Sequence, residues 1–242
     1  MKLHIFDDKE ILSEQLAEWI CDLISDTLKH QQFFTIVLSG GGTPKMLYQK
    51  LASEKFKARI DWQRIHVFWG DERVVPFSDE RNNAKMAFDF LLNHVDIPAS
   101  QIHIMRTDIE PNFAVAEYRK KLHTFFDSTG HSFDLVLLGM GDDGHTLSLF
   151  PGSLLIDEHY RWVNSVYNEQ QQMYRMTLMP LLVNKAGKVV FMVDGEKKAG
   201  VLEKVLEGEY KPAEFPAQLI SPENGELHWF LDKAAAKNLH TI

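Results

Sequence analysis

Residues 139–152 (GMGDDGHTLSLFPG) contain an unusual density of side chains that can do chemistry. The segment directly follows FDLVLL, an apolar run that predicts a buried strand. It holds four glycines, and glycine is used where the backbone turns sharply or lies close to a ligand. Asp142, Asp143 and His145 supply groups that can transfer protons. We therefore interpret this segment as part of a functional site rather than as a simple turn.

Asp143 and His145 are separated by one residue, so the carboxylate could orient the imidazole or both could bind a metal ion. His145 is one of eleven histidines, but only this one follows a buried strand and lies next to a glycine in such a segment. A zinc site is less favoured, because no second His or Cys stands at a familiar ligand spacing. Ser148 has no GxSxG motif around it, which argues against a serine hydrolase. A histidine that acts as general base on water remains.

Polar segments also follow three other predicted strands. They are SGGGTP at 39–44, GDER at 70–73 and DGEKK at 194–198. The carboxyl ends of parallel strands meet at one edge of a sheet, where ligands bind in open α/β folds. We expect all four segments to converge on one site.

The SGGGTP segment separates a strand from a helix whose first turn contains Pro44. Free N–H groups at a helix start, with the Ser39 and Thr43 hydroxyls and the backbone of Gly40 and Gly41, suit a phosphate. The segment is neither a P-loop nor a GxGxxG motif, so nucleotide binding is poorly supported. A tight strand-to-helix turn without a ligand is the alternative.

The remaining candidates are charged or amide side chains near the other strand ends. Asp71 and Arg73 could face a ligand, with Arg73 orienting an anion, or they could form a structural salt bridge. Asn82 and Asn83 could cap the next helix or bind sugar hydroxyls, and capping is favoured for at least one of them. The further cationic candidates, which could also be ordinary surface or helix-start residues, are Arg175, Lys197 and Lys198.

The rest of the chain alternates apolar strands with amphipathic helices. This rhythm predicts one Rossmann-like, doubly wound α/β domain over residues 1–242, with a mainly parallel sheet and helices on both faces. A helix is predicted over 13–29 with Ser13 as a possible N-cap. Strands are predicted at 33–39, 65–70, 101–105, 133–139, 175–179 and 188–195, and helices at 44–53, 83–95, 112–126 and 196–208.

Composition limits the partners. The chain has 26 Lys and Arg against 34 Asp and Glu, a net charge of −8, which argues against nucleic-acid or acidic-membrane surfaces. Cys21 is the single cysteine, so no intrachain disulfide or thiolate metal cluster is possible. Neither a signal peptide nor an apolar run of about 18 residues is visible. We expect a cytoplasmic enzyme, monomeric or a small homo-oligomer, that acts on a small molecule.

These motifs together resemble the 6-phosphogluconolactonase family, within the larger group that includes glucosamine-6-phosphate deaminases. The resemblance covers nearly the whole chain. It rests on LSGGGTP, FWGDERVVP with the following Asn-Asn, FDLVLLGMGDDGHTLSLFPG, RMTLMP, VDGEKKAGVL and HWFLDKAAA. It implies a Rossmann-like fold and hydrolysis of 6-phospho-D-glucono-1,5-lactone to 6-phosphogluconate, in the oxidative pentose phosphate pathway, without an organic cofactor. We also expect that no metal ion is needed.

The resemblance also implies roles for particular residues. His145 is similar to the family's general base, with Asp143 beside it and Asp71 and Arg73 lining the lactone pocket. The phosphate loop is implied to comprise Ser39, Gly40, Gly41 and Thr43, aided by Arg175 and Lys198, and Asn83 is expected to contact the substrate. This sequence departs from many relatives at Gly42, where a larger residue is common, and in VYNEQQQMYRM, where relatives often carry prolines.

The deaminase relatives provide the alternative function. They share the Asp-Gly-His core, but they carry an acid five residues after the histidine, which helps to open the sugar ring. Phe150 occupies that position here and cannot transfer a proton. The lactonase interpretation is therefore favoured on chemistry as well as on resemblance.

Overall fold

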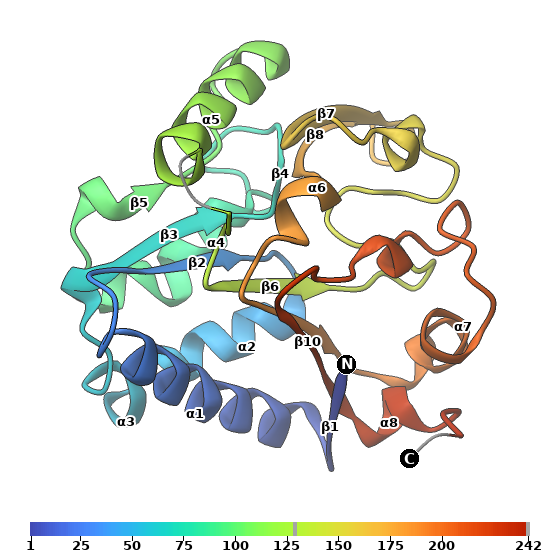
Figure 1. Ribbon diagram of the computed structural model, residues 1–242, viewed down its shortest axis with the longest axis horizontal. Coiled ribbons are helices and arrows are strands. Elements are labelled where there is room, and N and C mark those ends of the chain that lie inside the picture. Colours follow the sequence, from blue (N-terminus) through green and yellow to red (C-terminus); the bar gives the residue numbers. More distant parts are fainter. Residues whose placement is uncertain (128–129, 241–242) are drawn as a thin grey trace.

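A seven-stranded parallel sheet forms the centre of the computed structural model, which describes residues 1–127 and 130–240 (Figure 1). The strand order is β1-β10-β9-β6-β2-β3-β5, and every neighbouring pair is parallel. The strands of this sheet are β1 (Lys2–Phe6), β2 (Phe34–Leu38), β3 (Ile65–Trp69), β5 (Ile102–His103), β6 (Leu135–Gly139), β9 (Lys188–Val193) and β10 (Glu226–Asp232). The predicted parallel α/β class is confirmed.

The strand order changes direction between β2 and β6. After β2 the chain adds β3 and β5 on one side, whereas β6, β9 and β10 are added on the other. Connections that leave the carboxyl ends of β2 and β6 therefore diverge and leave a crevice between them, as in other doubly wound sheets. The loops that follow these two strands carry SGGGTP and GDDGH.

Helices cover both faces of the sheet, because successive side chains of each strand point to opposite faces. Ile36 and Leu38 belong to the core beneath one face, and Val37 belongs to the core of the other. The first face is covered by α1 (Lys9–Thr27), α2 (Gly42–Leu51), α3 (Glu54–Lys57) and α4 (Asn83–Phe90). The second is covered by α5 (Pro111–Phe126), α6 (Pro180–Val183), α7 (Ala199–Glu207) and α8 (Lys233–Ala236).

A second, antiparallel sheet of three strands was not anticipated. It consists of β4 (Asp71–Arg73), β8 (Met173–Leu178) and β7 (Val163–Asn168), in the order β4-β8-β7. The segment predicted at 175–179 lies here, as part of β8, and not in the parallel sheet. Pairing of Arg73 with Arg175 across β4 and β8 brings two arginines to the edge of the crevice.

The amino-terminal region differs from the prediction in two respects. The first helix begins at Lys9, and Asp8 caps it by accepting hydrogen bonds from the N–H groups of Glu10 and Ile11. Ser13 is not the N-cap, since it is buried inside the helix and its hydroxyl donates to the Lys9 carbonyl. The preceding segment forms β1, an edge strand paired with β10. No helix in the described part of the chain combines the length and apolar character needed to cross a membrane.

Candidate active site

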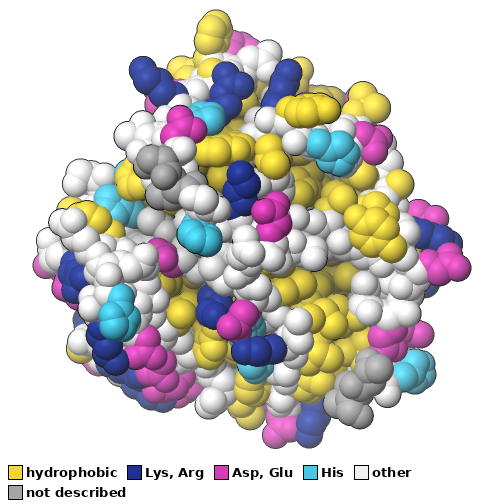
Figure 2. Space-filling model, viewed as in Figure 1, with side chains coloured by type: hydrophobic (Ala, Val, Ile, Leu, Met, Phe, Trp, Pro, Cys, Tyr) yellow, Lys and Arg dark blue, Asp and Glu magenta, His cyan; other side chains and the backbone are white. Residues whose placement is uncertain are grey.

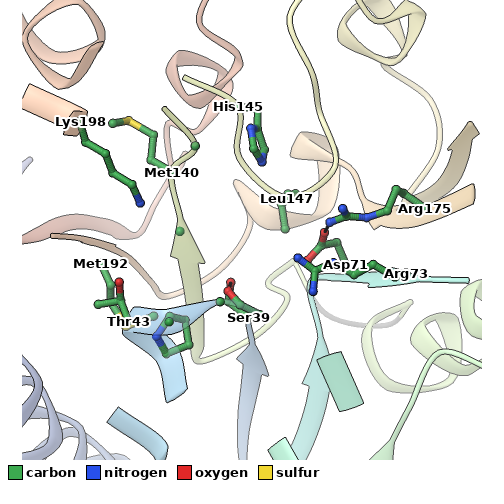
Figure 3. A pocket seen from close by; sticks show the side chains of 16 residues that line it. Ser39, Thr43, Asp71, Arg73, Met140, His145, Leu147, Arg175, Met192 and Lys198 are labelled. Atoms are coloured by element: carbon green, nitrogen blue, oxygen red, sulfur yellow. Dashed lines mark hydrogen bonds and ion pairs between the residues drawn. The ribbon is translucent and has the colours of Figure 1, made fainter. Parts of the chain in front are cut away.

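A pocket of about 180 Å³ lies at the carboxyl ends of β2, β6 and β9, beside β4 (Figure 3). It brings together nine of the eleven site residues predicted from the sequence, which are Ser39, Gly40, Gly41, Thr43, Asp71, Arg73, His145, Arg175 and Lys198. Figure 3 shows Lys198 and Thr43 on one side and Arg73 and Arg175 on the other, with His145 between them. The expected convergence of the four strand ends is confirmed.

His145 is held by Asp143, which lies beside the pocket rather than in its lining. The Nδ1 atom of His145 is 2.6 Å from Oδ1 of Asp143, and the same oxygen accepts the His145 backbone N–H at 3.1 Å. The hydrogen bond from His145 lowers the pKa of Asp143 and keeps it ionised. An ionised carboxylate can only accept, so Nδ1 carries a proton, and in the neutral imidazole the lone pair then lies on Nε2. His145 is therefore arranged as a base.

The loop around His145 is tightly folded, which explains its glycines. A Cβ on Gly141 would lie 2.1 Å from Nδ1 of His145, so only glycine lets the ring sit against this backbone. Gly144 has φ +83°, a conformation that glycine adopts without strain. The neighbouring Leu147, which lines the pocket, has φ 55° and lies in the left-handed region. Unusual backbone of this kind clusters at functional sites.

We expect Gly141→Ala to lower kcat by about tenfold or more, because its methyl group would displace the His145 ring and misplaced catalytic groups lose rate steeply. Steady-state kinetics with a melting curve would test this. Gly200→Ala is the control, since an added Cβ there meets nothing within 4 Å. Wild-type kcat in the Gly141 variant would show that the ring tolerates the shift.

The SGGGTP segment runs from β2 into the start of α2. Gly41 is the N-cap residue with φ 115°, and Tyr48 fixes Ser39 by accepting its backbone N–H and donating to its carbonyl. The first N–H groups of a helix have no partner within it, so those of Gly42 and Thr43 can bind an anion. The Thr43 hydroxyl donates to Asp194 instead of facing the pocket freely. Of the two groups through which Thr43 was predicted to bind phosphate, only its backbone N–H is therefore available.

The arginine side of the pocket is organised by Asp71. Its Oδ2 atom accepts hydrogen bonds from Arg175 at 2.5 Å and from the Ser148 hydroxyl at 2.7 Å. Burial raises the pKa of Asp71, but the charges of Arg175 and Arg73, together with the hydrogen bonds from Ser148 and Arg175, lower it overall. Asp71 is therefore an ionised partner of two arginines. That arrangement suits positioning better than the proton transfer expected of a catalytic residue.

Both arginines retain unused donor capacity. Among the residues that the structure describes, Nε of Arg73 and Nε of Arg175 are buried without a hydrogen-bond partner. Burial also lowers the pKa of Arg73. A buried donor left unpaired is costly, which favours an anion or a polarised oxygen nearby.

Asn83 does not line the pocket, contrary to the prediction that it binds substrate. It is only 1% exposed, and both ends of its amide are used by the protein. Nδ2 donates to the Asp71 carbonyl at 2.9 Å, and Oδ1 accepts from Arg73 at 2.7 Å. Asn82 is the N-cap of α4 and accepts the Lys85 N–H, so the predicted cap is confirmed.

Several contacts that shape the site were missed by sequence reasoning. Ser148 donates a hydrogen bond to Asp71, and Gln171 accepts one from Arg175. No sequence motif predicted either contact. Phe150 lies against the His145 ring, with centroids 4.9 Å apart, and under the Arg175 guanidinium. Glu72 is fully buried behind the pocket, and only its place between Asp71 and Arg73 drew attention to it.

Residues 7–229 match the family model described as glucosamine-6-phosphate isomerases/6-phosphogluconolactonase. The chain belongs to this family. It is 40% identical over 242 residues to a 6-phosphogluconolactonase of Synechocystis sp., with 98% of each chain covered. The solved 6-phosphogluconolactonase of Trypanosoma brucei has a TM-score of 0.87 at 28% identity, covering 99% of this chain and 98% of that one.

A second kind of relative shares the fold. A monomeric glucosamine-6-phosphate deaminase superposes with a TM-score of 0.85 at 21% identity, covering 99% of this chain and 100% of that one. A likeness at this identity shows the fold alone. The choice between lactonase and deaminase chemistry must therefore come from the site and from the relatives of higher identity.

Proposed function

We propose that this chain hydrolyses 6-phospho-D-glucono-1,5-lactone to 6-phosphogluconate. The observation that carries the proposal is the Asp143–His145 pair, which leaves a basic nitrogen at a pocket that also holds cationic groups on two sides. The curated relative of 40% identity bears the 6-phosphogluconolactonase name over nearly the same length. This relative and the chemistry of the pocket residues support the same reaction within a family that contains both activities.

The phosphate binds at the start of α2 together with Lys198. Lys198 has no ion-pair or hydrogen-bond partner for its side chain among the described residues, so its charge is available. Its loop is held by Asp232, which accepts the Gly195 N–H. Acidic and basic side chains are interspersed on the face shown in Figure 2, and the chain has a net charge of −8. The positive charge that attracts an anionic substrate must therefore come from the cationic residues of the pocket itself.

His145 acts first as a base and then as an acid. Its Nε2 takes a proton from a water molecule while the water oxygen attacks C1 of the lactone. The bond between C1 and the ring oxygen then breaks, and the imidazolium returns the proton to that oxygen, which becomes a hydroxyl. The product acid ionises and releases one proton to solvent. Asp143 stabilises the imidazolium between the two steps.

Arg73 and Arg175 lie across the pocket from Lys198. We assign them to the negative charge that develops on the carbonyl oxygen of the lactone. The charges of the two guanidinium groups, both at the lining of the pocket, supply the electrostatic stabilisation that such an oxyanion needs. Asp71 holds Arg175 through its ionised carboxylate and, through Asn83, is linked to Arg73. We therefore assign Arg175 to the reacting carbonyl, whereas the resemblance implied that it aids the phosphate loop.

Glucosamine 6-phosphate tests the alternative function. Phe150 places an apolar ring beside His145, where a deaminase carries an acid, so the purified enzyme is expected to release no ammonia from this substrate. The phosphorylated lactone in a parallel reaction shows that the preparation is active. Steady ammonia production would replace the lactonase assignment with the deaminase.

Chelation tests whether the reaction needs a metal ion. Prolonged treatment with EDTA is expected to leave kcat unchanged, because His145 and the arginines supply base and electrostatic stabilisation themselves. Activity is compared before treatment, after treatment and after adding back Zn²⁺ or Mg²⁺. Loss of activity that one divalent ion restores would assign Asp142, Asp143 and His145 as metal ligands.

We also propose that the enzyme is cytoplasmic, that it is a monomer or a small homo-oligomer, and that it has no nucleic-acid or membrane partner.

A further inference from the structure

Glu72 is a buried acid that the reaction described above does not use. It lies in the middle of β4, between Asp71 and Arg73, both of which line the pocket. Side chains alternate along a strand, so Glu72 points to the opposite side. It is 0% exposed, and it has no ion-pair partner within residues 1–127 and 130–240. A carboxylate buried without a cation needs other compensation.

Three backbone N–H groups provide that compensation. Oε1 of Glu72 accepts the N–H of Arg73 and the N–H of Asn83, each at 2.7 Å, and Oε2 accepts the N–H of Ala84 at 2.8 Å. The carboxylate thus fastens the start of α4 to β4. Burial raises the pKa of Glu72 to about 7 against the lowering effect of these hydrogen bonds. A carboxylate kept in such a place carries a stability cost, which favours a functional reason for it.

Asn83 connects this arrangement to the substrate pocket. Its Oδ1 accepts from Nη1 of Arg73, and its Nδ2 donates to Asp71. On its other side it lies against the phosphate loop, since a Cβ on Gly40 would be 1.9 Å from Oδ1 of Asn83. A shift of the Asn83 backbone would therefore move the Arg73 guanidinium and Gly40 together.

We propose that Glu72 is a positioning residue of the lactonase reaction, which by fixing the backbone of Arg73 and Asn83 sets the Arg73 guanidinium against the reacting carbonyl. The inference rests on the proposed function. Glu72 touches no substrate. Its effect on the reaction passes through Asn83 and Arg73, which distinguishes it from an acid that merely stabilises the fold.

Glu72→Gln tests the proposal, because the variant keeps the shape of the side chain and one acceptor oxygen. Its amide nitrogen would meet a backbone N–H, so the segment must shift. We expect kcat/KM on the phosphorylated lactone to fall by about tenfold to a hundredfold, the loss typical of a misplaced catalytic group. Asn82→Ala is the matched control, because Asn82 caps the same helix through the Lys85 N–H and lies outside the pocket lining.

The control variant is expected to lose thermal stability while keeping kcat/KM within about threefold of the wild type. Parallel losses of activity and melting temperature in the two variants would assign Glu72 to the fold alone. The wild-type enzyme is measured in the same assay. If it hydrolyses the lactone, the proposed function stands and only the role of Glu72 is rejected. If Glu72→Gln does not fold, Asn83→Ala replaces it, because it cuts the link to Arg73 but keeps the backbone N–H. Wild-type kinetics in Asn83→Ala would overturn the proposal.

A double-mutant cycle tests the route through Arg73. If Glu72 acts by setting Arg73, then Glu72→Gln should cost little further activity in an Arg73→Ala background, since residues acting as one unit are not additive. Each variant is assayed at a temperature where its melting curve shows it folded. Full additivity of the two losses would contradict the proposed route.

Discussion

His145→Ala is expected to lower kcat on 6-phospho-D-glucono-1,5-lactone by about 10²–10⁴-fold, the range for removal of a general base. The protein should remain folded. The His145 side chain is 29% exposed, lies in a loop and has Asp143 as its hydrogen-bond partner. Truncation therefore opens no large cavity in either core. The assay must subtract spontaneous hydrolysis, because this class of lactone opens in water unaided.

His123→Ala is the matched control for that experiment. His123 also contacts an aspartate, with Nδ1 2.8 Å from Oδ1 of Asp127, but it lies outside the pocket. Its kcat should equal that of the wild type. If His145→Ala retained near wild-type kcat, His145 would have no place in the mechanism and another base would be required.

Removal of the phosphate from the substrate is the second change with a large expected effect. Charge-assisted hydrogen bonds contribute about 1.5–3 kcal/mol each, so two lost contacts reduce kcat/KM by on the order of a hundredfold or more. Both kcat and KM should change, because the bound phosphate holds C1 against the water. Initial rates on the phosphorylated and unphosphorylated lactones measure this ratio.

Lys198→Ala assigns part of that loss to one residue. The variant should weaken hydrolysis of the phosphorylated lactone and barely change the small rate on the unphosphorylated one. Lys197→Ala is its control, because Lys197 is adjacent in sequence and absent from the lining of the pocket. Equal losses on both substrates would mean that Lys198 supports the fold or the chemistry rather than phosphate binding.

The sequence predicted the parallel sheet and the meeting point of its strand ends because both follow from local patterns. Apolar runs such as Phe34–Leu38 and Leu135–Gly139 identify buried strands without knowledge of their partners. Once the strands are parallel, their carboxyl ends share one edge of the sheet. Polar residues after those ends, including His145 and Lys198, are then placed together by topology alone.

Contacts between distant segments were not predictable in the same way. The pairing of β4 with β8 joins residues about a hundred positions apart. The charged sequence of β4, Asp71–Arg73, does not indicate this partner. Asp71 was predicted to be catalytic, but its hydrogen bonds from Arg175 and Ser148 suit an ionised carboxylate that positions Arg175. Asn83 was assigned to the substrate because its amide suits sugar hydroxyls, whereas the fold uses that amide internally.

Proton release by the purified enzyme on freshly prepared 6-phospho-D-glucono-1,5-lactone tests the central claim most directly. Each hydrolysis yields one carboxylic acid. At pH 7 this acid is fully ionised, so each turnover releases one proton that a pH-stat records. The account predicts a rate far above spontaneous hydrolysis, proportional to enzyme concentration and abolished by His145→Ala. A rate that equals the spontaneous one at every enzyme concentration would contradict the lactonase assignment.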